Sequence, residues 1–453
     1  MLKLYNTLWH TLQDFKPLDP SNVRIYSCGP TVYSTQHLGN MRSAFFTDML
    51  KQTLKLAGYE HITHVVNITD VGHLSDDGDH GEDKMEKGAK REGLTARDVA
   101  KKYTQEYLDD LAFLQLERFE FVTPATDDDT IVNKMSRATD HIAEQITMIQ
   151  RLGANWHIYE IPGDGIYMDT STMPDYWVLT NQKNLDNLAS WVRVKDTGKR
   201  NPTDFALWKF NTTGKQRDME RASPRWVGFP GRHIECSAMA THYLGDQFDI
   251  HTWGIEHIPI HHTNEIAQSE CSGAHKPRVN YRLHNQRLMM NGKKIAKSDG
   301  NVVYIRDIKT QGYSSEDVRY FFLQAHYRSF KDFSRDSLEA ASKGRKKLKL
   351  VDDTDYPLEQ VIAPLLDDLN TPQFLANLHK YGISQRLNDI FHLYKEEDTG
   401  NIEVPTEIKK LAAQRRQAKL DKDYDLADQL RNQLSELGWE MKDGKAEYSV
   451  TKK

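Results

Sequence analysis

The first part of the chain alternates apolar and polar positions in a way that predicts a parallel β-sheet. Residues 23–28 (VRIYSC) alternate and stop at Gly-Pro, which predicts a strand. Residues 40–57 have apolar positions at helical spacing and stop at Gly58, which predicts a helix. Residues 61–71 (HITHVVNITDV) predict a second strand. A strand, a helix and a strand in such close succession form a βαβ unit, so we expect an α/β fold in which ligands bind at the carboxyl ends of the strands.

Beyond this unit, the spacing of apolar positions predicts further helices and strands, followed by a region of helices alone. We expect a charged loop over 72–95 leading into a helix, helices over 94–116 and 131–152, short strands within 157–171, a second βαβ-like half from Phe205, and a helix over 264–274. From about residue 335 the spacing predicts helices only, which end in a helical hairpin over 407–438.

Composition excludes several classes of protein. The 453 residues include 28% charged side chains, and no run of about 18 apolar residues suggests a transmembrane helix. The N-terminal segment lacks the pattern of a secretory signal. Three cysteines cannot form a disulfide framework, which favours a reducing, cytoplasmic setting. The net charge of −5 means that any RNA binding needs local basic patches.

A metal site is suggested by two cysteines and a histidine–glutamate pair. Cys28 ends the first strand, and Cys236 lies in GRHIECSAM. His261 and Glu265 are four residues apart, so a helix would place them on one face. Two thiolates, an imidazole and a carboxylate suit zinc. The alternative is that each cysteine is a buried core residue, which is the assignment we keep for Cys271.

Two segments suggest phosphate binding. His37, Gly39 and Asn40 stand where the first helix begins, and a helix N-terminus attracts anions. Residues 293–301 (KKIAKSDGN) form a short basic loop suited to a polyphosphate. Taken singly, these segments are better explained as a common turn and a solvated basic loop.

Together the motifs resemble the cysteinyl-tRNA synthetase family, one of the class I aminoacyl-tRNA synthetases. The resembling segments follow the family order over nearly the whole chain: CGPTVYSTQHLGN, NITDVG, RNPTDFALWK, GRHIECSAM, HHTNEIAQSE, KIAKSDGN, DDLNTP and RRQAKLDKDYDLADQLRNQL. The resemblance implies a Rossmann-like parallel-sheet catalytic domain with an insertion, followed by an α-helical bundle and a small C-terminal domain. The implied regions are the catalytic domain (1–118 and 205–290), a connective insertion (119–204), the KIAKS loop and stem-contact region (291–335), the helical bundle (336–398) and an anticodon-binding region (399–453).

The resemblance also implies roles for single residues. The implied zinc ligands are Cys28, Cys236, His261 and Glu265. The implied ATP-binding and catalytic residues are His37, Gly39, Asn40, Lys294 and Lys297, while Thr69 and Glu256 match positions near the amino acid and ribose. The chain departs from the family at Asn40 (usually His), Ala296 (usually Ser), Arg232 (usually Trp) and Glu256 (usually Asp).

The implied activity is ATP-dependent activation of L-cysteine and its transfer to tRNA(Cys), with one zinc ion per chain and Mg²⁺ on the ATP. We expect a cytoplasmic monomer without a membrane partner. Two basic runs are candidate tRNA contacts: Lys409, Lys410, Arg415, Arg416, Lys419 and Lys422, and Lys343, Arg345, Lys346, Lys347 and Lys349. Tyr424 and Trp439 are candidates for base stacking. The alternatives are a ligase that joins cysteine to a small-molecule amine, and a non-aminoacylating, zinc-containing RNA-binding paralogue.

Overall fold

The computed structural model describes residues 1–71, 84–180, 198–211, 221–222, 227–295, 300–396, 405–443 and 448–452. Of the charged loop expected over 72–95, residues 72–83 lie outside the described residues, and residues 84–92 form a helix, α2 (Lys84–Glu92), instead. Residues 296–299 of the basic loop, which include Ala296 and Lys297, also lie outside the described residues. The chain divides into two compact units, Met1–Leu393 and Tyr394–Lys453.

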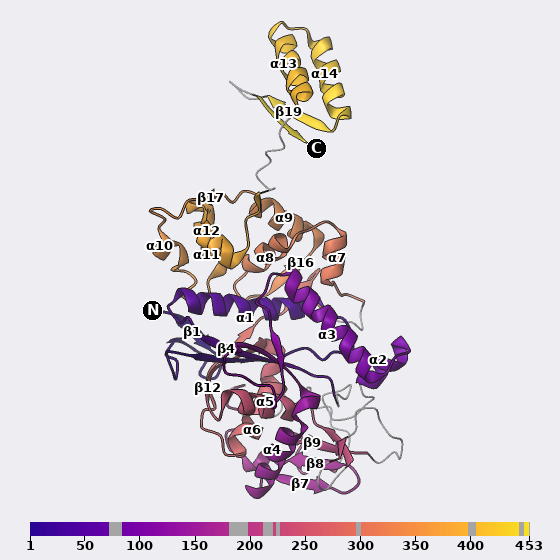
Figure 1. Ribbon diagram of the computed structural model, residues 1–453, viewed down its shortest axis with the longest axis vertical. Helices are drawn as coiled ribbons and strands as arrows, with labels where there is room; N and C mark the ends of the chain where they lie inside the picture. The colour runs from indigo at the N-terminus through magenta and orange to yellow at the C-terminus, as the bar shows by residue number, and fades with distance from the viewer. Residues whose placement is uncertain are drawn as a thin grey trace. The chain divides into compact units, whose positions relative to one another are not determined.

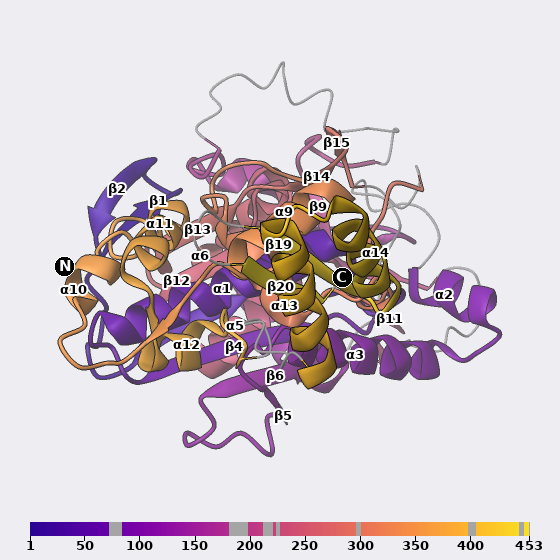
Figure 2. The same cartoon turned by 90° about the horizontal axis from the view of Figure 1, so that it is seen from above.

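A six-stranded sheet forms the centre of the first unit. Its strands are β3 (Val23–Ser27), β4 (Ile62–Ile68), β5 (Glu120–Val122), β6 (Asn133–Arg137), β12 (Phe248–Gly254) and β13 (Val279–Asn285). Their order is β13-β12-β3-β4-β6-β5, and every pairing is parallel. Strands β5 and β13 form the two edges (Figure 2). The expected parallel sheet is therefore confirmed, and β12 beside β3 joins segments that are distant in sequence.

Helices cover both faces of this sheet (Figure 1). Helix α1 (Leu38–Leu56) lies on one face near α3 (Ala96–Phe113), and α5 (Ile234–Leu244) packs against β3 and β4 on the other. Helices α4 (Ile142–Ala154) and α6 (Thr263–Cys271) pack beside α5. The mostly buried residues of the central strands fit a sheet covered on both sides.

A second, five-stranded sheet is antiparallel. Its strands are β7 (Ile158–Ile161), β8 (Gly165–Met168), β9 (Phe205–Phe210), β10 (Arg221–Ala222) and β11 (Val227–Pro230). Strand β9 corrects an expectation, because the segment from Phe205 belongs to this sheet and not to a second βαβ half. Its apolar residues are buried in a core shared with α4, α5 and α6, so the short apolar run did not reveal the sheet to which it belongs.

The helix expected over 131–152 is also wrong in its first half. Residues 133–137 form β6, a short 3₁₀ turn follows (Ala138–His141), and α4 begins at Ile142. The amide of His64 donates to the carbonyl of Val132 at 2.7 Å, and β6 pairs with both β4 and β5. Tertiary pairing with the sheet therefore overrides a pattern that is ambiguous over so few residues.

The first unit contains further elements. They are β1 (Lys3–Asn6), β2 (Thr11–Asp14), α2 (Lys84–Glu92), η2 (Thr170–Thr172), η4 (Ile255–His257), a π-helical turn η5 (Ile258–His262), β14 (Leu288–Met290), β15 (Lys293–Lys294), α7 (Ile305–Thr310), α8 (Ser315–Leu323), β16 (Lys331–Phe333), α9 (Arg335–Arg345), β17 (Leu350–Val351), α10 (Leu358–Ile362), α11 (Thr371–Tyr381), β18 (Ile383–Ser384) and α12 (Gln385–Phe391).

The second unit pairs two helices with a β-hairpin. Helices α13 (Thr406–Leu420) and α14 (Tyr424–Glu436) form the expected helical hairpin, and β19 (Trp439–Asp443) and β20 (Tyr448–Lys452) follow as an antiparallel pair that the sequence pattern did not reveal. Trp439 is buried in the core of this unit with Ile408 and Leu434, whereas Tyr424 is 64% exposed. Of the two stacking candidates, only Tyr424 is thus accessible. None of the described helices has the length and apolarity needed to span a bilayer.

Candidate functional site

A cavity of about 380 Å³ opens at the carboxyl ends of the central strands. Cys28 follows β3 and Asn67 lies near the end of β4, as expected from the βαβ pattern. The two segments touch closely: a Cβ atom at Gly29 would stand 1.5 Å from the carbonyl oxygen of Asn67, so only glycine fits. The amide of Gly29 donates to Asn67 Oδ1 at 2.8 Å and fixes the cavity wall.

The four expected metal-ligating side chains converge beside this cavity. The ligand atoms of Cys28, Cys236, His261 and Glu265 all lie within 4.8 Å of one another. They come from the end of β3, from α5, from η5 and from α6. His261 Nε2 lies 2.8 Å from Glu265 Oε1 without the alignment of a hydrogen bond, and His261 Nδ1 lies 2.8 Å from His233 Nδ1. The helical register that joins η5 to α6 puts His261 and Glu265 on one face, as their spacing predicts.

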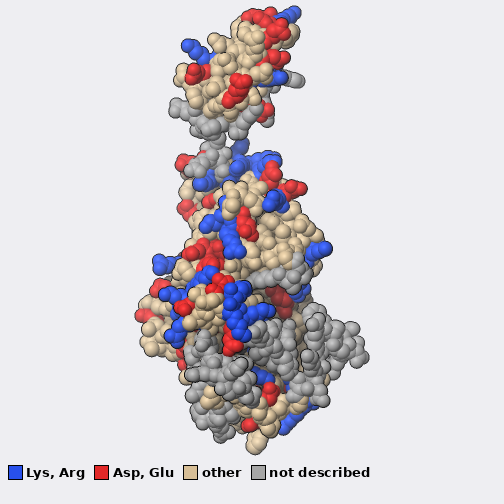
Figure 3. Space-filling model, turned by 90° about the vertical axis from the view of Figure 1, so that its right-hand side faces the viewer, with Lys and Arg blue, Asp and Glu red and all other residues tan. Residues whose placement is uncertain are grey.

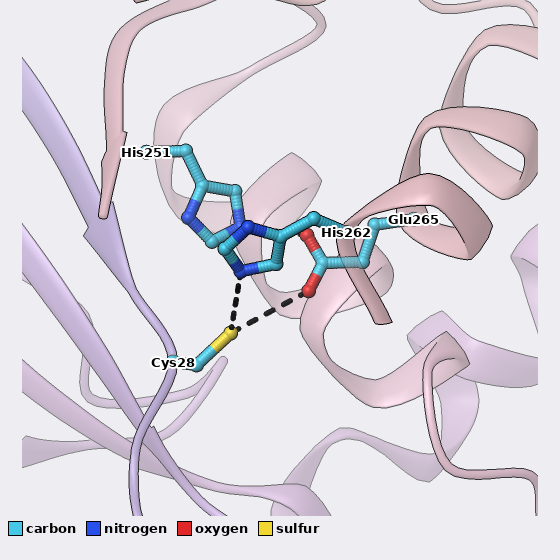
Figure 4. A group of neighbouring side chains, drawn as sticks. All are labelled: Cys28, His251, His262 and Glu265. Atoms are coloured by element: carbon cyan, nitrogen blue, oxygen red, sulfur yellow. Dashed lines mark hydrogen bonds and ion pairs between the residues drawn. The ribbon is translucent and has the colours of Figure 1, made fainter. Parts of the chain in front are cut away.

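A second group shares two of these residues and adds two histidines (Figure 4). Cys28 Sγ lies 3.4 Å from His262 Nε2 and 3.6 Å from Glu265 Oε1, while His251 Nε2 lies 2.6 Å from Glu265 Oε2. His262 Nδ1 is in turn 2.7 Å from His284 Nε2. Among the described residues, Cys28, Cys236 and His261 line the cavity, whereas His251 and His262 do not. The two histidines therefore support Glu265 and Cys28 from the protein side.

Burial and mutual contacts shift the pKa values of the group strongly. The hydrogen bond with Cys28, together with nearby His261, lowers the pKa of the Cys236 thiol to about 7 against the opposing effect of burial. Burial raises the pKa of the Cys28 thiol well above its usual range. Burial would lower the pKa of His261, but its contacts with Cys236 and Glu265 prevail and raise it to about 10. Such perturbed, mutually dependent groups in a cavity are typical of a functional site.

The expected nucleotide segment forms the start of α1. His37 is the N-cap of the helix: its Nδ1 accepts the backbone N–H of Asn40 at 3.2 Å. Asn40 Oδ1 accepts the backbone N–H of His37 at 3.1 Å, which completes a reciprocal cap. Both residues line the cavity. The departure at Asn40 therefore preserves the start of the helix, and the remaining ring proton of His37 is carried on Nε2.

One buried carboxyl group in the cavity was not anticipated. Glu235 is 2% exposed and precedes Cys236 on α5, and its Oε1 accepts the hydroxyl of Thr69 at 2.8 Å. Thr69 in turn accepts the side-chain amide of Asn67 at 3.1 Å. Burial raises the pKa of Glu235 well above its ordinary value. Its position in HIEC next to a candidate ligand was the only sequence signal for it.

Of the other expected residues, Glu256, Lys294 and Gly39 are not part of the described lining of this cavity. Glu256 is exposed, with its Oε2 3.7 Å from Arg287 Nε, and is not part of the described lining. Lys294 is exposed on β15, and Gly39 lies in the first turn of α1 without lining the cavity. Arg232, the family departure before HIEC, does line the cavity.

The expected basic runs are only partly on the surface. Arg345 is a buried partner of Asp317 at 2.8 Å, and Arg415 is 4% exposed, so neither is an accessible nucleic-acid contact in its own unit. On the face shown in Figure 3, lysine and arginine side chains of the described residues are interspersed with acidic ones. Any attraction for a polyanion therefore comes from local groups, as the net charge of −5 implies.

Comparison with known proteins identifies the family of the chain. Residues 14–343 match the family model described as tRNA synthetases class I (C) catalytic domain. The cysteine–tRNA ligase of Treponema denticola is 38% identical, with 96% of each chain covered, and cysteine–tRNA ligase 1 of Burkholderia lata is 39% identical over 98% of this chain and 95% of its own. The structure of Mycobacterium tuberculosis methionyl-tRNA synthetase in complex with methionyl-adenylate has the same fold, with a TM-score of 0.55 at 13% identity, covering 80% of this chain and 82% of its own. The chain belongs to the cysteine–tRNA ligase family of class I aminoacyl-tRNA synthetases.

Proposed function

We propose that this protein activates L-cysteine with ATP, transfers the cysteinyl group to the 3′ end of tRNA(Cys), and selects its substrate through one zinc ion. The observation that carries the proposal is the convergence of Cys28, Cys236, His261 and Glu265, the first three of which line the cavity that also contains the start of α1. Both alternatives are less favoured, because the relatives matched over nearly their full length are cysteine–tRNA ligases.

The chemistry of the donor set fits zinc. Two thiols, an imidazole and a carboxylate are the ligand types that zinc prefers, and His261 Nε2 is buried without an aligned hydrogen bond. His233 on the far side of the His261 ring, and His251 on Glu265, support the ligands as outer-shell partners usually do. When bound there, zinc supplies affinity for a thiolate, which a serine hydroxyl cannot match.

The chain itself positions the substrates for adenylation. The reaction is an in-line attack of the cysteine carboxylate on the α-phosphorus of ATP, so catalysis consists of positioning and charge neutralisation. His37 donates from Nε2 to a phosphate oxygen, and the N-terminal end of α1 adds positive potential. Lys294 and Lys297 neutralise the leaving pyrophosphate, which carries Mg²⁺.

The second unit is proposed to bind the tRNA. It carries exposed Lys409, Lys410 and Lys422 together with exposed Tyr424. Exposed cations and an exposed aromatic ring on one unit suit an RNA loop, whose phosphates and unstacked bases they contact. We further propose that the protein acts as a monomer in the cytoplasm, where its three free cysteines stay reduced.

Cysteine-dependent exchange of labelled pyrophosphate into ATP tests the activation step. We expect exchange with cysteine, much weaker exchange with serine, and loss of the cysteine signal after zinc is removed by a chelator and its return when zinc is added back. No exchange with cysteine would refute the proposal. Exchange that ignores zinc and accepts serine equally well would refute the role of the metal.

A further inference from the structure

We infer that Glu235 binds the α-ammonium group of the amino-acid substrate and thereby sets its orientation in the cavity. The inference rests on the proposed function, since it assumes that an amino acid with a thiol occupies this cavity. Glu235 precedes a candidate metal ligand, but its inferred partner is the substrate and not the metal.

The first observation is the composition of the cavity wall. Among the described residues that line it, Glu235 is the only one with a carboxyl group. Lys84 and Arg232 supply cations to the same wall. An amino acid presents both an ammonium and a carboxylate, so the cations suit its carboxylate and the phosphates of ATP, while the ammonium is left with Glu235 as its charged partner.

The second observation is the bonding of Glu235 itself. The residue is 2% exposed, its Oε1 accepts the Thr69 hydroxyl at 2.8 Å, and its Oε2 has no hydrogen-bond partner among the described residues. A buried polar atom without a partner costs free energy, so such an atom at a cavity wall calls for a ligand. The bond from Thr69, itself held by Asn67, fixes the rotamer and keeps Oε2 available.

The third observation is the distance that a substrate has to span. In cysteine only two carbon atoms separate the sulfur from the α-nitrogen. Glu235 and Cys236 are consecutive on the first turn of α5, and both line the cavity. A thiol beside Cys236 therefore leaves the ammonium within reach of Glu235. Glu256, the carboxylate suggested by family resemblance, is exposed beside Arg287 instead.

Paired ligands test this role in the zinc-loaded, full-length protein. L-cysteine and 3-mercaptopropionate carry the same thiol and carboxylate, but only cysteine has the ammonium. We expect Glu235→Gln to weaken cysteine binding by about 10- to 100-fold, the usual worth of a hydrogen bond to a charged group, and to leave 3-mercaptopropionate binding within about twofold. Calorimetric titration measures both affinities, and metal analysis should show unchanged zinc content. Glu235→Asp, which keeps the carboxyl group on a shorter arm, should retain part of the preference for cysteine.

The control is Glu120→Gln, which neutralises an exposed carboxylate on β5 and should bind both compounds like the wild type. Equal weakening of both compounds by Glu235→Gln, or loss of zinc, would show a structural role and overturn the inference. Unchanged cysteine affinity would overturn it as well. The proposed function can fail independently of this inference. If the wild-type protein binds cysteine through Glu235 but shows no pyrophosphate exchange, the ammonium site is supported and the ligase function is refuted.

Discussion

At the scale of single residues, the three buried cysteines have different surroundings. Cys236 lies with Cys28, His261 and Glu265 at the cavity, whereas Cys271 packs into the apolar core beneath α4 and α5. We expect Cys236→Ser to weaken zinc binding by at least roughly 100-fold, since changes to outer-shell partners alone cost 10- to 100-fold. Cysteine activation should fall in parallel. Metal analysis after dialysis and pyrophosphate exchange measure the two effects.

Cys271→Ser is the matched control for that variant. It places the same hydroxyl in a buried site without ligand neighbours, so it should reduce stability but retain zinc. A Cys236→Ser protein with full zinc content would contradict the assignment of Cys236 as a ligand.

Asp110 on α3 offers a pH-dependent test that is independent of the metal. Burial, reinforced by nearby Glu106 and opposed by Lys309, raises the pKa of Asp110 to about 7. The folded state therefore holds this proton more tightly than the unfolded state, so the carboxyl group costs stability as the pH rises from about 4 to 7. Asp110→Asn should be more stable than the wild type by about 1 to 2 kcal/mol at pH 8, with the difference vanishing near pH 4.

Urea denaturation of both proteins at the two pH values measures this effect. Asp109→Asn, at the exposed neighbouring position, is the control and should change stability little at either pH. A stability difference between Asp110→Asn and the wild type that is the same at pH 4 and pH 8 would exclude titration of Asp110 as its cause.

Sequence motifs identified part of this chemistry and missed the rest for a physical reason. Cys28, Cys236, His261 and Glu265 stand out because thiols are rare and a four-residue spacing marks one helix face. His251 lies on β12 and Glu235 lies on α5. Their positions near the site depend on how these two elements pack, which the spacing of residues in the sequence does not predict. Residues of that kind become visible only once the sheet is assembled.

At the scale of secondary-structure elements, Arg42 connects helix α1 to the segments that follow β13 and α8. It is 3% exposed, and its guanidinium donates to the carbonyls of Gln286, Arg287, His326 and Ser329 at 2.8 to 3.4 Å. Arg42→Ala removes a buried guanidinium and its bonds to four carbonyls, so we expect a loss of about 3 kcal/mol or more.

The midpoint and slope of urea unfolding measure this loss. Arg97→Ala, which removes an exposed arginine from the first turn of α3, should change stability by less than about 0.5 kcal/mol. Equal effects of the two substitutions would show that the four carbonyls do not depend on Arg42.

The accuracy of the element predictions follows the length of each pattern. The helices expected over 40–57 and 94–116 are confirmed as α1 and α3, because a long stretch with helical spacing of apolar residues is compatible only with a helix. The five residues of β6 contain one apolar residue, Met135, so their pattern does not distinguish a strand from a helix. The six mostly apolar residues of β9 fit a strand of either sheet. Their place is decided by partners that are distant in sequence.

At the scale of the whole molecule, the two compact units allow the proposed roles in activation and tRNA binding to be tested separately. The first unit ends with Phe391 and Leu393, both 0% exposed, whose carbonyls accept Arg319 and Arg345. A chain truncated after residue 396 keeps these anchors and should retain cysteine-dependent pyrophosphate exchange at the wild-type rate. Its kcat/KM for tRNA charging should fall at least about tenfold, because the cations and Tyr424 of the second unit are lost.

Lys409→Ala/Lys410→Ala/Tyr424→Ala in the full-length chain is the matched variant and should show the same selective loss. Unchanged charging by the truncated enzyme would exclude the second unit from tRNA binding, whereas loss of exchange would show that activation depends on it.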